Sequence, residues 1–238
     1  MTLCRDQAHR HELYVIGAGG HGRELHAYIE DLRRAGWQGE LKGFLDDGVP
    51  KGLHRGLEVI GPITVLDFLR NGAGRSSLYI TAVGSNPLRR EIVSRLKDVY
   101  GEALTPWTLL HPLAYVGEDV EIGIGSCVAP NAILTASVRI GQHCILNVKA
   151  SVSHNCTVGD FANINPAATI CGWVTIGEGA SIGAGAIVKD RISIGAWSLI
   201  GAGAVVTRDI PSNVTAVGVP ARIIKNTGLL SCPASERH

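Results

Sequence analysis

A glycine-rich segment near the start of the chain has the residue types and spacing that bind phosphate. Gly17, Gly19 and Gly22 fit the pattern G-x-G-x-x-G. The apolar stretch Leu13–Ile16 precedes them, and residues 23–35 have helical periodicity. In this setting, backbone amides at the start of a helix hold a pyrophosphate. A tight strand–helix turn without a ligand would explain the same glycines.

Two aspartates follow the next predicted strand, Leu41–Leu45, where an acidic side chain commonly meets a ribose. The combined pattern predicts a nucleotide site. Its expected residues are Gly17, Gly19, Gly20, His21, Gly22, Asp46 and Asp47. A nicotinamide dehydrogenase would use the same loop, but this part of the chain has only about ninety residues and no hydride-transfer domain follows it. A nucleotide-sugar diphosphate suits the loop equally well.

A second candidate for chemistry is His154, in the segment Ser153-His154-Asn155. Neutral imidazole can accept a proton at physiological pH, so an outward-pointing histidine could act as a general base. A solvated surface histidine would have the same sequence signature. Of the other histidines, His111 is expected to pack at a domain junction and His143 to lie on the surface.

The element that must position His154 is a six-residue repeat. Every sixth residue from Val116 to Val206 is aliphatic, and the residue four positions later is mostly small. This period fits neither a helix nor an alternating strand and is the signature of a hexapeptide parallel β-helix. Three units make one triangular coil, the aliphatic side chains point inward, and each coil depends on its neighbours for burial.

Residues 18 apart should therefore stack on the same face of the solenoid. Gly172 is expected one coil above His154, where its amide could donate to an oxyanion. Ala184 and Ala202 should also stack, within two Gly-Ala-Gly-Ala stretches that could form a groove with exposed amides. Simple corner packing would explain these small residues as well.

Composition excludes several classes of protein. The chain has 238 residues and a net charge of +1, so no basic surface favours nucleic acid. No apolar run has membrane-spanning length, and the polar start of the chain lacks a signal-peptide core, which predicts a cytoplasmic protein. The six cysteines lack paired metal spacing and are expected to be reduced. No metal site is predicted.

Alternating strands and helices predict an α/β, Rossmann-like domain before the solenoid. We expect a nucleotide-sugar-binding domain over 1–108, a β-helix over 109–225 and a flexible tail over 226–238. Within the first domain, further predicted helices cover 62–70 and 88–98. Further predicted strands are Leu78–Val83 and Trp107–Leu110.

Three segments together resemble the hexapeptide-repeat sugar acetyltransferases of the PglD/NeuD/PerB type. They are GAGGHG with FLDD, the stretch from ILN to SVSHNCTVGDF, and the closing AVGVPAR. The resemblance covers residues 12 to 225. It implies a left-handed β-helix, a homotrimer with active sites between solenoids, acetyl-CoA as donor and a nucleotide-linked amino sugar as acceptor.

The resemblance also implies roles for individual residues. His154 matches the family's proposed catalytic base, Gly172 its oxyanion donor, and Asn147 a polar position near the acceptor or thioester. Asn147 could equally be a left-handed corner residue. The implied donor-binding residues are Asn163, Gly172, Ala184, Ala202 and Arg208, with Arg222 and Lys225 as further candidates for the CoA phosphates.

Two departures from the family pattern stand out. Asn155 replaces the acidic neighbour of the catalytic histidine; it can still orient the ring, but without a full charge it should leave a weaker base. Asn163 replaces a histidine that some relatives carry near the cofactor. Asp160 could supply a nearby carboxylate or be a solvated turn residue. O-acetylation of a sugar hydroxyl and a non-catalytic trimeric scaffold remain alternatives.

Overall fold

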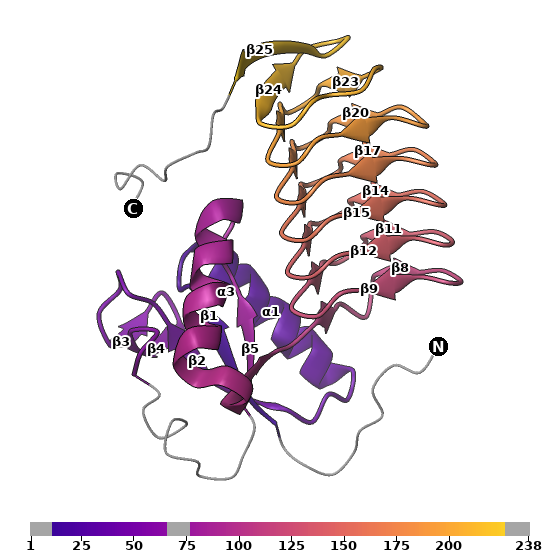
Figure 1. Ribbon diagram of the computed structural model, residues 1–238. Coiled ribbons are helices and arrows are strands. Elements are labelled where there is room, and N and C mark those ends of the chain that lie inside the picture. The colour runs from indigo at the N-terminus through magenta and orange to yellow at the C-terminus, as the bar shows by residue number, and fades with distance from the viewer. Residues whose placement is uncertain (1–10, 66–76, 227–238) are drawn as a thin grey trace.

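The computed structural model describes residues 11–65 and 77–226. An α/β domain lies beside an upright solenoid (Figure 1). The fold confirms the expected Rossmann-like domain and left-handed parallel β-helix. No helix in the described ranges is long and apolar enough to cross a membrane.

The N-terminal domain is built on a six-stranded sheet with the order β3-β4-β2-β1-β5-β6. All neighbours are parallel except the hairpin β3–β4. The first strand is buried almost entirely because helices cover both faces of the sheet. The elements are β1 (Glu12–Ile16), α1 (Gly20–Arg34), β2 (Glu40–Leu45), β3 (Gly52–His54), β4 (Leu57–Gly61), β5 (Ser77–Thr81), α3 (Asn86–Tyr100), the short 3₁₀ helix Gly101–Ala103 and β6 (Leu104–Pro106).

The sequence prediction for this domain needs three corrections. The hairpin β3–β4 was not expected, because its strands are short and its outer residues polar. The predicted strand Trp107–Leu110 is instead the junction between β6, which completes the first sheet, and β7 (Leu109–Leu110), which begins the solenoid. The predicted helix 62–70 begins as a turn over 62–65, and its remainder lies outside the described residues.

Apart from its last two strands, the solenoid consists of two-residue strands in three parallel sheets, with a register of 18 residues. Val152 pairs with Ile170, for example, and Val158 with Ile176. The second residue of each strand points inward, and the column from Val128 to Ala216 forms one continuous apolar core. These observations confirm the triangular coil that the six-residue period predicts.

The three sheets form the sides of the triangle. The first contains β7, β10 (Cys127–Val128), β13 (Ile145–Leu146), β16 (Asn163–Ile164), β19 (Ser181–Ile182), β22 (Leu199–Ile200), β24 (Val214–Val217) and β25 (Arg222–Asn226). The second contains β8 (Tyr115–Val116), β11 (Ile133–Leu134), β14 (Ser151–Val152), β17 (Thr169–Ile170), β20 (Ile187–Val188) and β23 (Val205–Val206). The third contains β9 (Glu121–Ile122), β12 (Arg139–Ile140), β15 (Thr157–Val158), β18 (Thr175–Ile176) and β21 (Ser193–Ile194).

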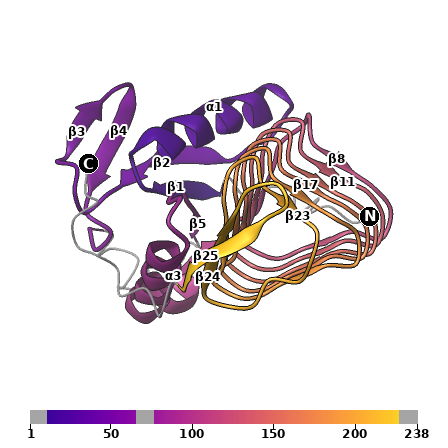
Figure 2. The ribbon, with the colours of Figure 1, turned by 90° about the horizontal axis from the view of Figure 1, so that it is seen from above.

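Three rows of turns form the corners of the triangle. We call the turns around residues 143, 161, 179 and 197 the covered corner, because the N-terminal domain packs on them. The turns around 154, 172, 190 and 208 are the open corner, and those around 148, 166, 184 and 202 the alanine corner. Seen along its axis, the solenoid is a triangle with the N-terminal domain against one side (Figure 2).

A buried cation fixes the N-terminal domain to the covered corner. Arg89 of α3 is fully buried. Its guanidinium donates to the carbonyls of Val83, His143 and Phe161 and to Oδ1 of Asn163, at 2.7 to 3.0 Å. Asn86 adds a bond of 2.9 Å to the carbonyl of Gly179. Since these bonds span several coils, the two domains meet in one defined orientation.

The predicted flexible tail, 226–238, contains one described residue, Asn226, which ends β25. That strand pairs antiparallel with β24 and closes the last coil. The remainder, 227–238, lies outside the described residues.

Candidate active site

His154 lies at the open corner with an exposed side chain. Its Nδ1 is 3.0 Å from Oδ1 of Asn155. Because an amide oxygen only accepts, this contact assigns the proton to Nδ1 and the lone pair to Nε2. Asn155 adopts a left-handed conformation at φ 60°, which asparagine tolerates well. The corner therefore presents an oriented imidazole with Nε2 as the basic atom.

Gly172 lies directly above this ring, as the 18-residue register predicts. A Cβ atom at Gly172 would be 2.6 Å from Cε1 and 2.8 Å from Nε2 of His154. Among the backbone hydrogen bonds of the described residues, the carbonyl of Gly172 accepts from Arg191, whereas its N–H donates to none. Glycine thus leaves room for the imidazole and places an unused amide beside it.

Sequence reasoning missed Trp173. Its ring centroid is 6.4 Å from that of His154, and the two planes are nearly perpendicular at 86°. Trp173 is 52% exposed. The repeat places it one residue after Gly172, but the repeat does not indicate that an exposed aromatic ring at this turn lies beside His154.

The predicted donor residues fall on two corners. Arg208 shares the open corner with His154 and Gly172, three coils above the histidine, or about 14 Å at the usual strand spacing. Ala184 and Ala202 stack as expected, with Gly203 N–H donating to the carbonyl of Ala184 at 2.8 Å. These alanines lie at the alanine corner, a full side of the triangle away. A single chain therefore does not bring all the predicted donor residues together.

Two asparagines of the predicted site have hydrogen-bond partners within the chain. Asn163 is buried; Nδ2 donates to the carbonyl of Gly84 and Oδ1 accepts from Arg89, both at 2.7 Å. The domain interface uses both ends of the Asn163 amide, so a structural role is visible, whereas the predicted cofactor contact stays a prediction. Asn147 does not have a left-handed backbone, and its Oδ1 accepts from Val148 N–H at 2.7 Å. It is half-buried at the alanine corner rather than beside His154.

The glycine loop has the close packing that its pattern requires. A Cβ at Gly22 would lie 2.4 Å from the carbonyl oxygen of Gly17, and Gly17 itself adopts φ 109°. Nothing lies within 4 Å of the positions that Cβ atoms would take at Gly19 and Gly20, where α1 begins. The loop therefore exposes its backbone to a ligand at the helix start.

The two aspartates brace loops in this structure. Asp46 accepts from Ala18 N–H in the glycine loop and from Gly48 N–H, both at 2.8 Å. Asp47 accepts from Ile63 N–H at 2.9 Å and pairs with Arg95 at 3.0 Å. A structural role is thus visible for both carboxylates, whereas the predicted ribose contact stays a prediction.

His21 projects from the same loop. Its Nδ1 lies 2.8 Å from a carboxylate oxygen of Glu24. Its buried Nε2 has no partner among the described residues. Because this nitrogen is buried, the ligand contact of His21 stays a prediction.

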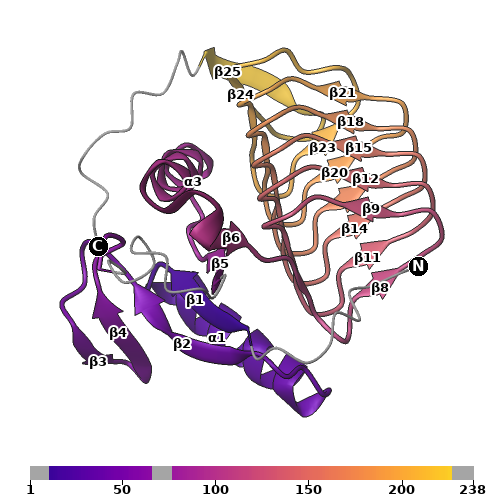
Figure 3. The same ribbon diagram turned by 60° about the horizontal axis from the view of Figure 1, so that its bottom comes forward.

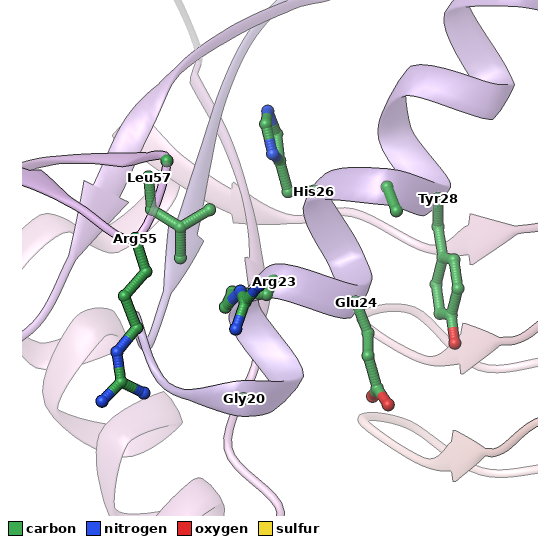
Figure 4. A pocket seen from close by; sticks show the side chains of 9 residues that line it. Gly20, Arg23, Glu24, His26, Tyr28, Arg55 and Leu57 are labelled. Atoms are coloured by element: carbon green, nitrogen blue, oxygen red, sulfur yellow. The ribbon is translucent and has the colours of Figure 1, made fainter.

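A cavity of about 620 Å³ lies between α1 and the tip of the hairpin β3–β4. Arg23 and Arg55 reach toward it close to Gly20 (Figure 4). Both arginines are exposed, and sequence reasoning missed them because their approach depends on the unexpected hairpin. Two guanidinium groups beside a helix start favour an anionic ligand.

Two further histidines, His111 and His143, are structural. His111 is buried at the domain junction, as expected; Nδ1 accepts from Leu113 N–H and Nε2 lies 3.2 Å from Asp31. The surface position expected for His143 is wrong. That ring is buried between Tyr79 and Phe161, because the N-terminal domain covers its corner.

Asp160 serves the turns of the covered corner rather than His154. Its Oδ1 accepts from Gln142 N–H at 2.7 Å. Arg222 donates to the carbonyl of Ala221, and Lys225 lies on exposed β25. The described cysteines Cys127, Cys144, Cys156 and Cys171 are free thiols. The described ranges hold no cluster of three or more His, Cys, Asp or Glu that could bind a metal.

Comparisons with protein families match both halves of the chain. The PglD N-terminal domain matches residues 12–96, and the bacterial transferase hexapeptide family (six repeats) matches residues 174–208. Residues of this chain are also 30% identical, over 131 positions, to the uncharacterized protein L142 of Acanthamoeba polyphaga mimivirus. That match spans about a quarter of the viral protein's length, 24%.

Solved structures match almost the whole chain. The acetyltransferase domain of PglB from Neisseria gonorrhoeae is 31% identical, with 91% of this chain and 100% of that chain covered and a TM-score of 0.78. PerB from Caulobacter crescentus, solved with CoA and GDP-perosamine, is 34% identical, with coverages of 89% and 96% and a TM-score of 0.78. WeeI from Acinetobacter baumannii is 29% identical, with coverages of 89% and 99% and a TM-score of 0.72.

The matched structures span both domains, and the same two domains carry the glycine loop and the histidine–glycine pair described above. The chain belongs to the hexapeptide-repeat sugar acetyltransferases of the PglD and PerB type.

Proposed function

We propose that this protein transfers the acetyl group of acetyl-CoA to the amino group of a nucleotide-linked amino sugar, with His154 as general base. The observation that carries the proposal is the pairing of an oriented, exposed imidazole with the free amide of Gly172 directly above it. The relatives supply the substrate classes, since PglB was solved with acetyl-CoA and PerB with CoA and GDP-perosamine.

The reaction needs no covalent enzyme intermediate. As the amine attacks the thioester carbon, Nε2 of His154 takes a proton from the nitrogen. The carbonyl oxygen becomes an oxyanion, which the Gly172 N–H stabilises. Collapse of the tetrahedral intermediate breaks the carbon–sulfur bond, and the imidazolium returns its proton to the CoA sulfur. The products are the acetamido sugar and CoA.

Asn155 fits this scheme as the group that orients the base. Its Oδ1 accepts from Nδ1 of His154 and so keeps the lone pair on Nε2. An amide stabilises the imidazolium less than a carboxylate would, because it carries no full charge. We therefore expect a working base that an acidic neighbour would improve.

We place the donor along the open corner. The thioester would lie at Gly172 and the CoA phosphates near Arg208, two coils or about 10 Å higher. Ala184 and Ala202 would complete the groove from a neighbouring solenoid, because in their own chain they lie on another corner. This arrangement requires an oligomer, and we propose the homotrimer that the family resemblance implies.

We assign acceptor binding to the domain 1–108 and acetyl transfer to 109–225. The nucleotide diphosphate would meet the exposed glycine loop, with Arg23 and Arg55 from the adjacent cavity as partners for its charge. His21, in the first turn of α1, would complete the set of acceptor-binding residues. The free thiols of the described residues fit the reducing cytoplasm, which we propose as the place of action.

The test is a direct transfer assay with acetyl-CoA and UDP-, GDP- and dTDP-linked 4-amino-4,6-dideoxy sugars. Each amino sugar is matched with the corresponding 4-hydroxy sugar, and both CoA release and the acetylated product are measured. We expect turnover with at least one amine and none with its hydroxyl counterpart. Turnover on hydroxyl acceptors alone would replace the proposal by O-acetylation. A folded trimer that binds no acetyl-CoA by calorimetry would indicate a scaffold.

A further inference from the structure

Trp173 occupies a backbone conformation that a bulky side chain rarely takes. Its φ is +62°, in the left-handed region. Aromatic residues gain nothing locally from this geometry, and strained residues of this kind persist where the surroundings or the function require them. The residue is also largely exposed to solvent. Neither local propensity nor burial in the solenoid accounts for tryptophan here.

The covered corner shows what normally justifies a bulky ring at such a turn. Phe161 and Trp197 have the same left-handed conformation, at φ 58° and 59°. Phe161 stacks on the buried ring of His143, with centroids 5.2 Å apart. Trp197 lies under the guanidinium of Arg90 from α3, at 4.3 Å. In both cases the ring lies against the N-terminal domain or the residues that it covers.

The open corner offers Trp173 no such cover from the described chain. The left-handed residues below it in this row are small and polar; they are Asp119, Ser137 and Asn155. Arg191, one coil above, places its guanidinium 5.7 Å from the indole centroid. Arg191 can hold the ring in place by a cation–π contact. The rest of the exposed surface remains available to a ligand.

The neighbours of Trp173 indicate which ligand this is. The indole flanks His154, with ring centroids 6.4 Å apart, and comes directly after Gly172. A thioester held at Gly172 would follow the row that leads to Arg208, whereas Trp173 belongs to the adjacent row. An amine that approaches Nε2 must therefore bring the ring that carries it close to the indole.

We propose that Trp173 is a specificity-determining residue whose indole packs against the pyranose ring of the acceptor sugar. The proposal rests on the function proposed above, since it takes His154 as the base. A pyranose presents an apolar face of C–H groups, which suits a large aromatic surface, and the indole N–H can donate to a ring hydroxyl. The acceptor would thus be held at both ends, by its nucleotide in the N-terminal domain and by its sugar ring at the open corner.

The experiment compares Trp173→Asn and Trp173→Phe with the wild type, using the best acceptor from the panel above. Asparagine suits the left-handed backbone, so the variant should fold with an unchanged or higher Tm. We expect KM for the acceptor to rise about 3- to 10-fold in Trp173→Asn and to recover largely in Trp173→Phe. KM for acetyl-CoA and the trimeric state should stay unchanged.

Trp197→Asn is the matched control, because it removes the same side chain from the same backbone conformation at the other corner. It should lower Tm and leave KM for the acceptor within about twofold of the wild type. An unchanged acceptor KM in Trp173→Asn would overturn the proposal. So would a rise confined to acetyl-CoA, or loss of the trimer, which would assign the indole to the donor or to a second chain.

His154→Ala in the same assay distinguishes failure of the Trp173 proposal from failure of the proposed acetyltransferase function. If His154→Ala abolishes turnover while Trp173→Asn behaves like the wild type, only the role of Trp173 is wrong. If His154→Ala retains full turnover, or no nucleotide-linked amine is acetylated, the proposed function itself is wrong.

Discussion

Two histidines at two corners of the same solenoid have opposite environments. His154 is exposed at the open corner, with Nδ1 on Asn155. His143 is buried at the covered corner between Tyr79 and Phe161, and its Nδ1 has no partner among the described residues. Figure 3 shows the strands on either side of the open corner, in the stacks of β14 and β15, on the side turned away from the N-terminal domain.

The repeat supplies equivalent positions, and packing of the N-terminal domain determines which of them stay exposed. Burial, with a further contribution from Arg89, lowers the pKa of His143 to about 4. That imidazole is neutral at physiological pH and serves as packing. The coils at the open corner have the same register but keep their side chains available, so chemistry is possible there.

Removing the imidazole from the open corner should have the largest effect. His154→Ala should lower kcat roughly 10²- to 10⁴-fold, because the attacking amine loses its base. Acetyl-CoA binding, measured by calorimetry, should persist since the donor groove is intact. His143→Asn keeps a residue suited to the left-handed turn and should retain far more of the turnover. Near-wild-type kcat in His154→Ala would remove His154 from the mechanism.

Removing the cation from the covered corner should lower the stability of the protein and leave the catalytic residues in place. Arg89→Met leaves three carbonyls and Oδ1 of Asn163 unpaired in a buried interface, so the free energy of unfolding should fall by about 3 kcal/mol. Burial lowers the pKa of Arg89 to about 10, and the group is still a cation at neutral pH. Urea unfolding measures the change.

Arg90 provides the matched control for Arg89. It is the next residue of α3 and is exposed, with its guanidinium over Trp197. Arg90→Met should cost less than about 1 kcal/mol. Equal losses for the two variants would contradict the central role assigned to the buried cation.

The buried His143 should make stability depend on pH. The pKa of His143 is about 4 in the folded protein, whereas an ordinary histidine has a pKa of 6.5. Between pH 4 and pH 6.5 the unfolded chain therefore binds more protons than the folded protein. Stability should therefore fall as pH drops from 6.5 toward 4, by up to about 3 kcal/mol from this group, and be level above 6.5. His143→Asn should flatten that part of the curve. Identical pH slopes for the two proteins would show that His143 titrates normally.

Adding a methyl group at Gly172 tests whether catalysis requires the close approach of this residue to the His154 ring. In Gly172→Ala the new carbon would lie within 2.8 Å of two imidazole atoms, so the ring must move. We expect kcat to fall about 10²-fold, because a displacement of this size misaligns the base. Circular dichroism and Tm should show an unchanged fold. A kcat equal to that of the wild type would separate Gly172 from catalysis.

The smallest effect concerns the neighbour of the base. Asn155→Asp keeps the acceptor for Nδ1 and adds a charge that stabilises the imidazolium, so kcat should rise roughly two- to fivefold. Asn155→Ala removes the orienting contact and should lower kcat. Steady-state kinetics at saturating acetyl-CoA measure kcat for both variants and for the wild type. A lower kcat in Asn155→Asp would mean that this family member depends on the neutral amide.

Much of the solenoid and part of the site could be predicted because both follow a fixed period. The interval of 18 residues correctly placed Gly172 over His154 and Ala202 over Ala184. The same interval does not predict that Asn163 is buried, because its burial depends on packing against α3, which carries Arg89. Arg23 and Arg55 were missed for a similar reason, since an unexpected hairpin brings them to one cavity.

The coil, its register and the row on which each residue lies follow from the sequence alone, because a six-residue apolar period is buried when three units form each coil. The glycine loop also follows from the sequence, because its close contacts exclude side chains at Gly17 and Gly22. Which corner is covered depends instead on how the two domains pack. The N-terminal domain buries His143 and leaves His154 exposed, and this burial depends on long-range contacts that no local pattern contains.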